Sequence, residues 1–224
     1  MVDTRHVRDH YNTISSNYES HDPTIGKRLR KIRSHVDFSH KKVLDVAGGT
    51  GYIGQQIIEM GGTYIDVDIS TGMLSLAKGK LSLRRGDYLL LLGDVHKIPL
   101  RSNQVDVALI SEALEHVENP KMVLNEVYRV LKPNGTVIIT NPNPFWAPIQ
   151  LIAEVVKFKS PEGPHKYIYH KELMRMIERA GFSIRTIDID FMPSDKSLWR
   201  WLETKFRNTV ISNFALKHYI IALK

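Results

Sequence analysis

A glycine-rich turn between a predicted strand and a predicted helix is the feature that most constrains how this chain can fold. Residues 43–54 read VLDVAGGTGYIG, so an apolar run ends at Asp45 and the chain then turns through Gly48, Gly49 and Gly51 into a helical pattern. Glycine lets the backbone approach a ligand closely, and the first turn of the helix directs free N–H groups at that ligand. The turn therefore predicts a cofactor site at the edge of a parallel sheet, and the segments that follow decide which cofactor.

Strand-like and helical segments alternate over most of the chain, which predicts an α/β fold with a parallel sheet covered by helices on both faces. The predicted strands are residues 43–46, 64–68, 88–92, 105–110, 136–140, 183–189 and 219–223. The predicted helices are residues 52–60, 120–131 and 170–180, with another that starts near Ser70. Residues 133–135 read PNG, a stop signal for the helix before them.

A segment rich in proline and aromatic residues interrupts this alternation at residues 142–168 and contains an apolar helical piece at 149–158. We predict a substrate lid here; the alternatives are a surface packing element and a membrane-surface helix. The expected apolar walls are Phe145, Trp146, Ile149, Leu151 and Ile152. The predicted organisation is one domain, 1–224, with a helical cap (1–38), a cofactor-binding core (39–142), the lid (143–169) and a C-terminal helix with strands (170–224).

Composition excludes several classes of site. The chain has 224 residues and no cysteine, so disulfides, thiolate metal sites and cysteine nucleophiles are excluded. No apolar run is long enough to span a bilayer and the N-terminus has no signal-peptide core, so we expect a cytoplasmic protein.

Trp199 and Trp201, in an ambiguous stretch from 191 to 214, are expected in the core rather than at a ligand.

The net charge is +7, and part of it lies in a basic run near the N-terminus. We favour a solvated helix face for this run; a nucleic-acid patch and the mouth of a site for an anionic substrate are the alternatives. The run consists of Lys27, Arg28, Arg30, Lys31 and Arg33.

Two acidic residues at predicted strand ends suit a nucleoside. Asp68 ends the second strand about 20 residues after the glycine turn, where a carboxylate can accept hydrogen bonds from both ribose hydroxyls. Asp66 is the second candidate for this role. Asp94 follows the third strand, where its carboxylate could accept from an adenine amino group while Val95 offers its backbone N–H. The alternatives are a helix cap before Ser70 and an ordinary Asp turn.

Taken in order, these segments resemble class I S-adenosylmethionine (SAM)-dependent methyltransferases. The matching segments are VLDVAGGTG, YIDVDIS followed by GML, GDVHKIPL, VDVALISEALEHVENP and LKPNGTVIIT, and the opening HVRDHYNTISSNYE is similar to the first helix of these enzymes. The turn AGGTG is typical of the quinone-biosynthesis group. The glycine turn is also compatible with a nicotinamide-dependent dehydrogenase, but that family does not account for the last three segments. The resemblance implies a Rossmann-like sheet of seven strands, mostly parallel, whose last strand is reversed.

The resemblance also implies a role for each matching residue. Gly49 and Gly51 would pass close to the methionine portion of SAM, Asp45 would orient its amino group directly or through water, and Ser111 would lie under the sulfonium. Tyr11 and Tyr18 could close over the pocket. Ala47 replaces the usual first glycine and must stay in a backbone region open to L-residues. The full expected set is Tyr18, Asp45, Ala47, Gly48, Gly49, Gly51, Asp68, Ile69, Met73, Asp94, Val95 and Ser111.

A cluster of acidic and histidine residues follows the fourth strand. In Glu112-Ala113-Leu114-Glu115-His116, a helical turn would place Glu112 beside Glu115 and His116, and His165 could add a fourth ligand. This resembles the E-x-x-E-H…H arrangement of metal-dependent methyltransferases, which implies a site for Mg, Mn or Zn. Many metal-free relatives also read E-x-L-x-H here, so pocket walls are the alternative. His116 and His165 are the base or ligand candidates.

The expected function is transfer of a methyl group from SAM to a small, partly apolar acceptor, at a hydroxyl oxygen or an activated carbon. Two alternatives stay open. An RNA methyltransferase would use the basic run, although no RNA-binding module is attached, and a non-catalytic protein would bind SAM without turning it over.

Overall fold

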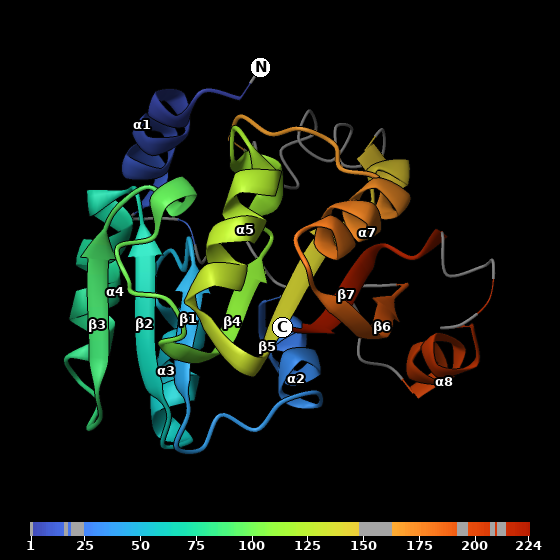
Figure 1. Ribbon diagram of the computed structural model, residues 1–224, viewed down its shortest axis with the longest axis horizontal. Coiled ribbons are helices and arrows are strands. Elements are labelled where there is room, and N and C mark those ends of the chain that lie inside the picture. The colour runs from blue at the N-terminus through green and yellow to red at the C-terminus, as the bar shows by residue number, and fades with distance from the viewer. Residues whose placement is uncertain are drawn as a thin grey trace.

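The structure is a computed structural model that describes residues 2–15, 18, 25–147, 163–191, 197–206, 209 and 214–224, with 197–200 described by their backbone alone. Its strands are β1 (Lys42–Val46), β2 (Thr63–Asp68), β3 (Tyr88–Leu92), β4 (Val105–Ser111), β5 (Leu131–Pro142), β6 (Ser183–Asp190) and β7 (Lys217–Leu223). They form a sheet in the order β3-β2-β1-β4-β5-β7-β6, in which β7 is antiparallel to both neighbours and the other pairs are parallel (Figure 1). The predicted seven-stranded, mostly parallel sheet with a reversed last strand is confirmed.

Helices cover both faces of the sheet, because successive residues of each strand point to opposite sides. Leu44 and Val46 pack in the core under α5 and α7, whereas Val43 packs in the core under α2 and α3. Figure 1 shows α5 and α7 in front of the sheet and α3 behind it. The helices are α1 (Thr4–Ile14), α2 (Ile25–Arg33), α3 (Tyr52–Glu59), α4 (Thr71–Leu81), α5 (Pro120–Val130), α7 (His170–Arg179) and α8 (Ser197–Phe206), with short 3-10 turns η2 (Val95–Lys97), η3 (Leu114–His116) and η4 (Pro144–Trp146). Of the helices described, none has the length and apolar character needed to cross a membrane.

Most predicted strands agree with the structure to within two residues. The exception is β5, which begins at Leu131 rather than at Thr136, because Leu131 already pairs with Val105 across the Pro-Asn-Gly segment. The predicted helix at 149–158 and most of the predicted lid lie outside the described residues. Trp201, on α8, is 55% exposed with the Lys205 ammonium over its ring, so its predicted core position is wrong.

Three of the five cations of the basic run on α2 face the interior of the protein. The Nζ atom of Lys27 lies 3.0 Å from Glu203 and 3.1 Å from Asp190, and both acids belong to the C-terminal part of the chain. Lys31 lies 2.9 Å from Asp190 and 3.2 Å from Glu203. All four side chains are nearly or fully buried, so the network fixes α2 against β6 and α8.

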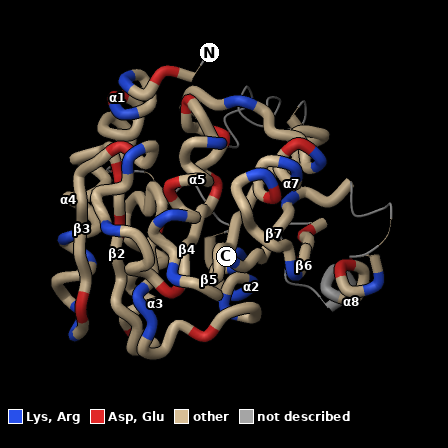
Figure 2. The backbone as a smooth tube through the Cα atoms, viewed as in Figure 1, with Lys and Arg blue, Asp and Glu red and all other residues tan. Residues whose placement is uncertain are grey.

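This network corrects the favoured interpretation of the basic run as a solvated helix face. Lys27, Arg28 and Lys31 point inward, and only Arg30 and Arg33 of the five cations are exposed. Along the described backbone, residues of both charge signs are spread over the molecule (Figure 2). Two exposed cations on one helix are few for the phosphate contacts that a nucleic-acid surface needs.

The glycine turn packs directly against a buried tyrosine. Tyr64, on β2, is fully buried, and its hydroxyl donates a 3.0 Å hydrogen bond to Asp45. A Cβ atom on Gly48 would lie 2.5 Å from the Tyr64 hydroxyl oxygen, and one on Gly54 would lie 2.5 Å from a ring carbon. Both glycines are therefore needed for space rather than for an unusual backbone conformation.

We expect Gly54→Ala to lower the free energy of unfolding by about 1–3 kcal/mol, because the added methyl group overpacks the core against Tyr64. Gly79→Ala is the matched control, because that helical glycine has nothing within 4 Å of its added Cβ. The control is expected to gain up to about 1 kcal/mol from helix propensity. Urea denaturation of both variants measures the difference, and equal stability of the two would contradict the packing argument.

Candidate active site

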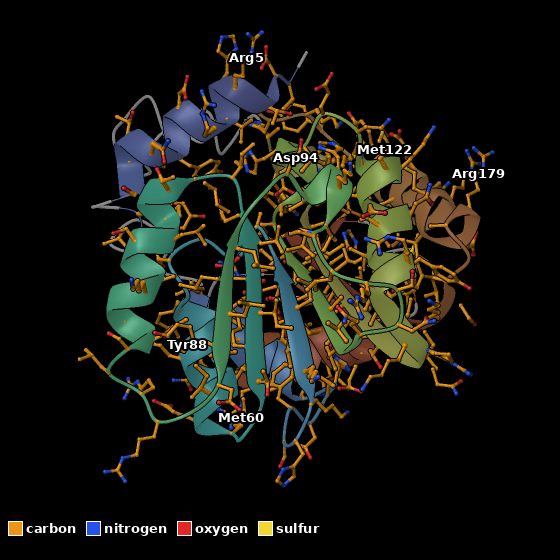
Figure 3. The ribbon with its side chains drawn as sticks, turned by 60° about the vertical axis from the view of Figure 1, so that its left-hand side comes forward. Arg5, Met60, Tyr88, Asp94, Met122 and Arg179 are labelled. Atoms are coloured by element: carbon orange, nitrogen blue, oxygen red, sulfur yellow. The ribbon has the colours of Figure 1, made fainter. Side chains whose placement is uncertain are left out.

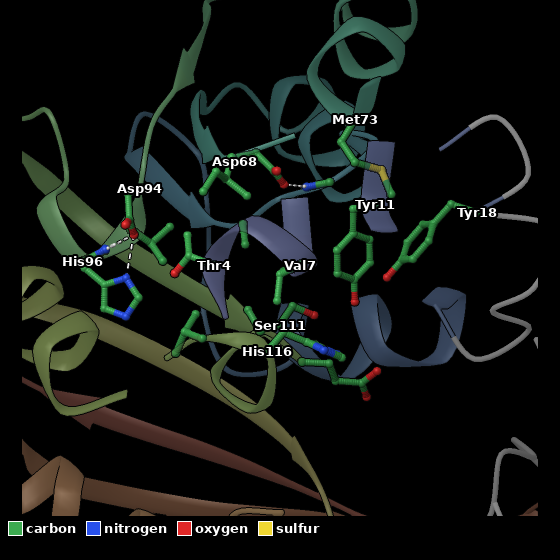
Figure 4. A pocket seen from close by; sticks show the side chains of 17 residues that line it. Thr4, Val7, Tyr11, Tyr18, Asp68, Met73, Asp94, His96, Ser111 and His116 are labelled. Atoms are coloured by element: carbon green, nitrogen blue, oxygen red, sulfur yellow. Dashed lines mark hydrogen bonds and ion pairs between the residues drawn. The ribbon is translucent and has the colours of Figure 1, made fainter. Parts of the chain in front are cut away.

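A cavity opens at the carboxyl ends of β1, β2, β3 and β4, beside the point where the strand order reverses. This is the place where open α/β sheets bind ligands. The cavity encloses about 690 Å³ when its open mouth is included. In Figure 4, Tyr11, Tyr18 and Met73 lie on one side, and Asp94 and His96 on the other. Its lining is Thr4, Val7, Tyr11, Tyr18, Ala47, Gly49, Asp68, Ile69, Met73, Asp94, Val95, His96, Ser111, Glu112, Ala113, His116 and Val117.

The turn after β1 is held by carboxylates from β2. The Gly48 N–H donates to Asp66 at 2.9 Å, and the Gly49 N–H donates to Asp68 at 3.0 Å. Gly49 has a φ of 65°, which glycine adopts without strain. Ala47 has a φ of 56° and so lies in the left-handed region, the smallest of those open to L-residues.

Three carboxyl groups are buried beneath this turn on one face of the sheet. Burial raises the pKa of Asp45 to about 7, and it raises the pKa of Asp66 well above its ordinary value. The pKa of Asp68 is also raised by burial, although the N–H groups of Ser70 and Gly49 oppose this. Removing water from a carboxylate disfavours its charged form, so the burial of these three groups favours protonation or a nearby cation.

Asp68 lines the cavity, but Asp45 does not. Asp68 accepts from the Ser70 N–H at 2.8 Å with one oxygen and from Gly49 with the other. Asp45 lies one layer deeper, is 1% exposed and accepts from Tyr64. Asp45 was predicted to contact the ligand either directly or through water, and its depth below the cavity favours the contact through water. Gly48 and Gly51 also lie outside the lining and shape the turn instead.

The segment after β3 presents Asp94 at the edge that α1 covers. Figure 3 shows Asp94 at this end of the molecule, with Met60 and Tyr88 at the opposite end. Asp94 accepts from the backbone N–H of His96 at 2.9 Å and pairs with its Nδ1 at 2.6 Å. The Asn119 N–H donates to Nε2 of the same ring at 3.0 Å. His96 therefore joins η2 to the start of α5, and it keeps Asp94 at the cavity wall.

A charged residue in a strained backbone conformation follows β4 directly. Glu112 has a φ of 54°, and its carboxylate pairs with two buried cations. Arg28 Nη1 lies 2.5 Å from Glu112 Oε2, and Lys217 pairs with Oε1. Such strain persists only where the surroundings determine the conformation, which the two ion pairs do here.

An imidazole and two phenol rings form the remaining wall. His116 Nδ1 lies 3.0 Å from the carbonyl oxygen of Pro164. A carbonyl can only accept, so in the neutral ring Nδ1 carries the proton and Nε2 carries the lone pair. Tyr11 packs edge-on against His116 at 5.6 Å between ring centroids and against Tyr18 at 5.9 Å.

Residues 44–139, which run from β1 into β5 and include the turns after β1, β2, β3 and β4, match the family model described as a methyltransferase domain. These residues thus match a methyltransferase domain, and the sheet has the seven strands and the reversed last strand that the resemblance to class I SAM-dependent methyltransferases implied. SAM is the cofactor of this family.

Several proteins whose names describe methyltransferases are similar to the chain. The demethylmenaquinone methyltransferase of Renibacterium salmoninarum is 31% identical over 144 residues, which are 60% of this chain and 59% of that protein. A demethylmenaquinone methyltransferase of Streptomyces griseus is 27% identical over 203 residues, which are 79% of this chain and 86% of that one. The chain thus spans about three fifths of the Renibacterium protein's length. A SAM-dependent methyltransferase structure from Thermotoga maritima has 20% identity and a TM-score of 0.73, covering 98% of this chain and 100% of that one, and it supports the fold.

The four predicted metal ligands are divided between two neighbouring hollows. Glu112 is held by two cations, and the Nδ1 atoms of His116 and His165 lie 3.0 Å from backbone carbonyls. Glu115 and His165 line a smaller neighbouring hollow instead of the cavity. Within the described ranges, no group of three or more histidine and acidic side chains is arranged to hold a metal ion. The predicted divalent-metal site therefore stays a prediction, which the arrangement of these described side chains does not support.

The cavity of the methyltransferase domain brings together most of the expected cofactor contacts and adds others. It includes nine of the twelve expected residues, all except Asp45, Gly48 and Gly51. Sequence reasoning missed Thr4, Val7, His96, Ala113 and Val117 as lining residues. The amphipathic pattern of α1 indicates that one face of the helix points inward. Residues 96, 113 and 117 lie inside the segments that resemble methyltransferases. Neither signal distinguishes a residue that lines the cavity from one that packs in the core. Phe145 and Trp146, expected as apolar substrate walls, are not part of this lining.

Proposed function

We propose that this chain transfers a methyl group from SAM to a small, partly apolar acceptor. The observation that carries the proposal is that nine expected residues, which come from the opening segment and four of the later matching segments, line one cavity. Asp68 would hold the ribose, Asp94 and Val95 the adenine, and Gly49 and Ser111 the methionine portion. The remaining expected contacts are Ala47, Ile69, Met73 and Tyr18, while Asp45, Gly48 and Gly51 support the turn.

The described side chains fit a cationic cofactor. Three buried carboxyl groups lie beneath the turn with raised pKa values, and a bound cation would favour their charged forms. The backbone at Gly49 leaves open space where a side chain would stand. Bound SAM would supply an electrophilic methyl group.

His116 is the proposed general base. Its Nε2 carries the lone pair in the neutral ring, because Nδ1 donates to the Pro164 carbonyl. The ring lines the same cavity as Ser111, so Nε2 can take a proton from an acceptor hydroxyl or an activated carbon. His165, the second candidate, lies outside this cavity and is not assigned a role.

The walls around His116 support the acceptor class. Val7, Tyr11, Ala113 and Val117 give one end of the cavity an apolar and aromatic lining. Relatives whose names refer to demethylmenaquinone are consistent with an aromatic acceptor. RNA is the less favoured acceptor, because three of the five cations that suggested it are turned inward.

A methyl-transfer screen tests this proposal. Purified protein and SAM are incubated with hydroxylated aromatics, quinols and RNA, and the demethylated cofactor is measured. We expect turnover with a quinol or phenol. Turnover with RNA alone would assign the alternative acceptor, and SAM binding with no turnover on any class would indicate a non-catalytic protein.

SAM binding itself is tested by Asp68→Asn. We expect calorimetry to give a micromolar dissociation constant for the natural chain and one at least about tenfold weaker for the variant, because a charged hydrogen-bond acceptor is lost. Asp87→Asn is the control, because Asp87 is exposed at the far end of β3. Binding of NADH instead of SAM would overturn the cofactor assignment.

A further inference from the structure

One side chain of α1 joins that helix to the first turn of α4. The Oδ1 atom of Asn12 accepts from Ser70 Oγ at 2.7 Å, from the Gly72 N–H at 3.0 Å and from Thr71 Oγ1 at 3.4 Å. The Gly72 N–H can only donate, so the Asn12 atom facing it must be the oxygen and not the amide nitrogen. Asn12 thus caps α4 from a separate helix.

The same contacts continue to the cofactor end of the cavity. The Ser70 N–H donates to Asp68 Oδ1 at 2.8 Å, and the Ser70 hydroxyl accepts from the Met73 N–H at 3.1 Å. Asp68 accepts from Gly49 with its other oxygen. A continuous set of hydrogen bonds therefore runs from Asn12 through Ser70 and Asp68 to the glycine turn.

Helix α1 contributes three residues to the cavity lining: Thr4, Val7 and Tyr11. Val7 is its only buried residue, so apolar burial holds this helix weakly. The approach of α1 to α4 also depends on Gly72, because a Cβ there would lie 2.8 Å from Ser15 Oγ and 3.3 Å from the Asn12 carbonyl oxygen. A polar contact can decide the position of a helix that buries so little.

We infer that Asn12 is a positioning residue that holds α1 against the cofactor cavity and joins this helix to the ribose-side carboxylate Asp68. The inference rests on the proposed function for its ligand, but the position of α1 can be measured without one. Closure by Asn12 would slow cofactor release, because α1 forms one wall of the cavity.

Three variants of the full chain test the inference. We expect Asn12→Ala to weaken SAM binding roughly tenfold through faster dissociation, because the acceptor of all three contacts is lost. Asn12→Asp should stay within about threefold of the natural chain, because a carboxylate accepts the same contacts and suits a helix N-terminus. Thr13→Ala is the control on α1, because Thr13 is exposed and its hydroxyl donates to a backbone carbonyl of its own helix.

Hydrogen exchange of the ligand-free protein gives the second readout. In Asn12→Ala the amides of α1 should exchange at least tenfold faster than in the natural chain, while those of β1 and β4 stay unchanged. Gly72→Ala should loosen α1 without altering Asn12, which provides a second variant if the first folds poorly. Unchanged α1 exchange in both variants, or equal SAM affinities of the alanine variant and the natural chain, would overturn the inference. If the natural chain binds no SAM, the proposed function fails, whereas the exchange result still decides the role of Asn12.

Discussion

Replacing His116 with asparagine should reduce kcat at least about 100-fold while SAM affinity stays within about threefold, because proton transfer by a positioned base contributes factors of this size. The asparagine amide can still donate to the Pro164 carbonyl that accepts from His116 Nδ1. It offers no basic lone pair in place of Nε2. Steady-state kinetics with the acceptor found in the screen, together with calorimetry for SAM, separates the loss of chemistry from the loss of binding.

The control for this variant is His40→Asn. His40 is exposed in the connection between α2 and β1, and its φ of 57° suits asparagine. Its turnover should equal that of the natural chain. Equal turnover of the His116 variant would instead remove His116 from the mechanism. Turnover should also survive excess chelator, because the predicted ligand Glu112 is already held by Arg28 and Lys217.

The strands were predictable because their signal is local. Buried parallel strands need near-continuous apolar runs, and residues 105–110 have one. The apolar run at 88–92 is equally clear, although β3 lies at the edge of the sheet and is partly exposed. The start of β5 was not predictable, because Pro-Asn-Gly at 133–135 resembles a stop signal, whereas the strand already begins at Leu131, which pairs with Val105. A turn signal in the sequence carries no information about a partner strand that lies 26 residues away.

The charged residues required long-range information. The sequence distance between Lys27 and Glu203 is 176 residues, so nothing near the basic run indicates that acids of β6 and α8 neutralise it. The same holds for Glu112, whose partners Arg28 and Lys217 come from opposite ends of the chain. A helical turn at 112–116 would have placed Glu112 beside His116. Instead, Glu112 has a left-handed backbone conformation and a short 3-10 turn follows it, so its carboxylate contacts Arg28 and Lys217.

The cofactor half of the cavity was more predictable than the acceptor half. Asp68 ends β2 and Asp94 follows β3, and these two strands are parallel neighbours, so topology alone brings the two residues to one edge. The wall formed by Val7 and Tyr11 depends on the docking of α1, which is set by the contact of Asn12 with the start of α4. Such a contact between separate helices leaves no periodic pattern in the sequence.

Asp45→Asn should make the protein more stable at pH 8 by up to about 4 kcal/mol, with a much smaller gain at pH 4. The reason is the burial of Asp45, which raises its pKa to about 7 from 3.8. A carboxyl whose pKa is raised in the folded state binds its proton more tightly there than in the unfolded chain. The stability this gives is fully present below about pH 4 and is lost as the pH rises to about 7.

Asparagine carries no such charge, and its side-chain oxygen can still accept from the Tyr64 hydroxyl. The gain in the free energy of unfolding should therefore grow between pH 4 and pH 7 and then level off. Urea denaturation across this range measures it, with the exposed Asp87→Asn as the control. A gain independent of pH would show that the charge of Asp45 costs the fold nothing. If the gain follows the expected curve while SAM binding weakens, the buried carboxylate is retained for its charge toward a cationic ligand at the expense of stability.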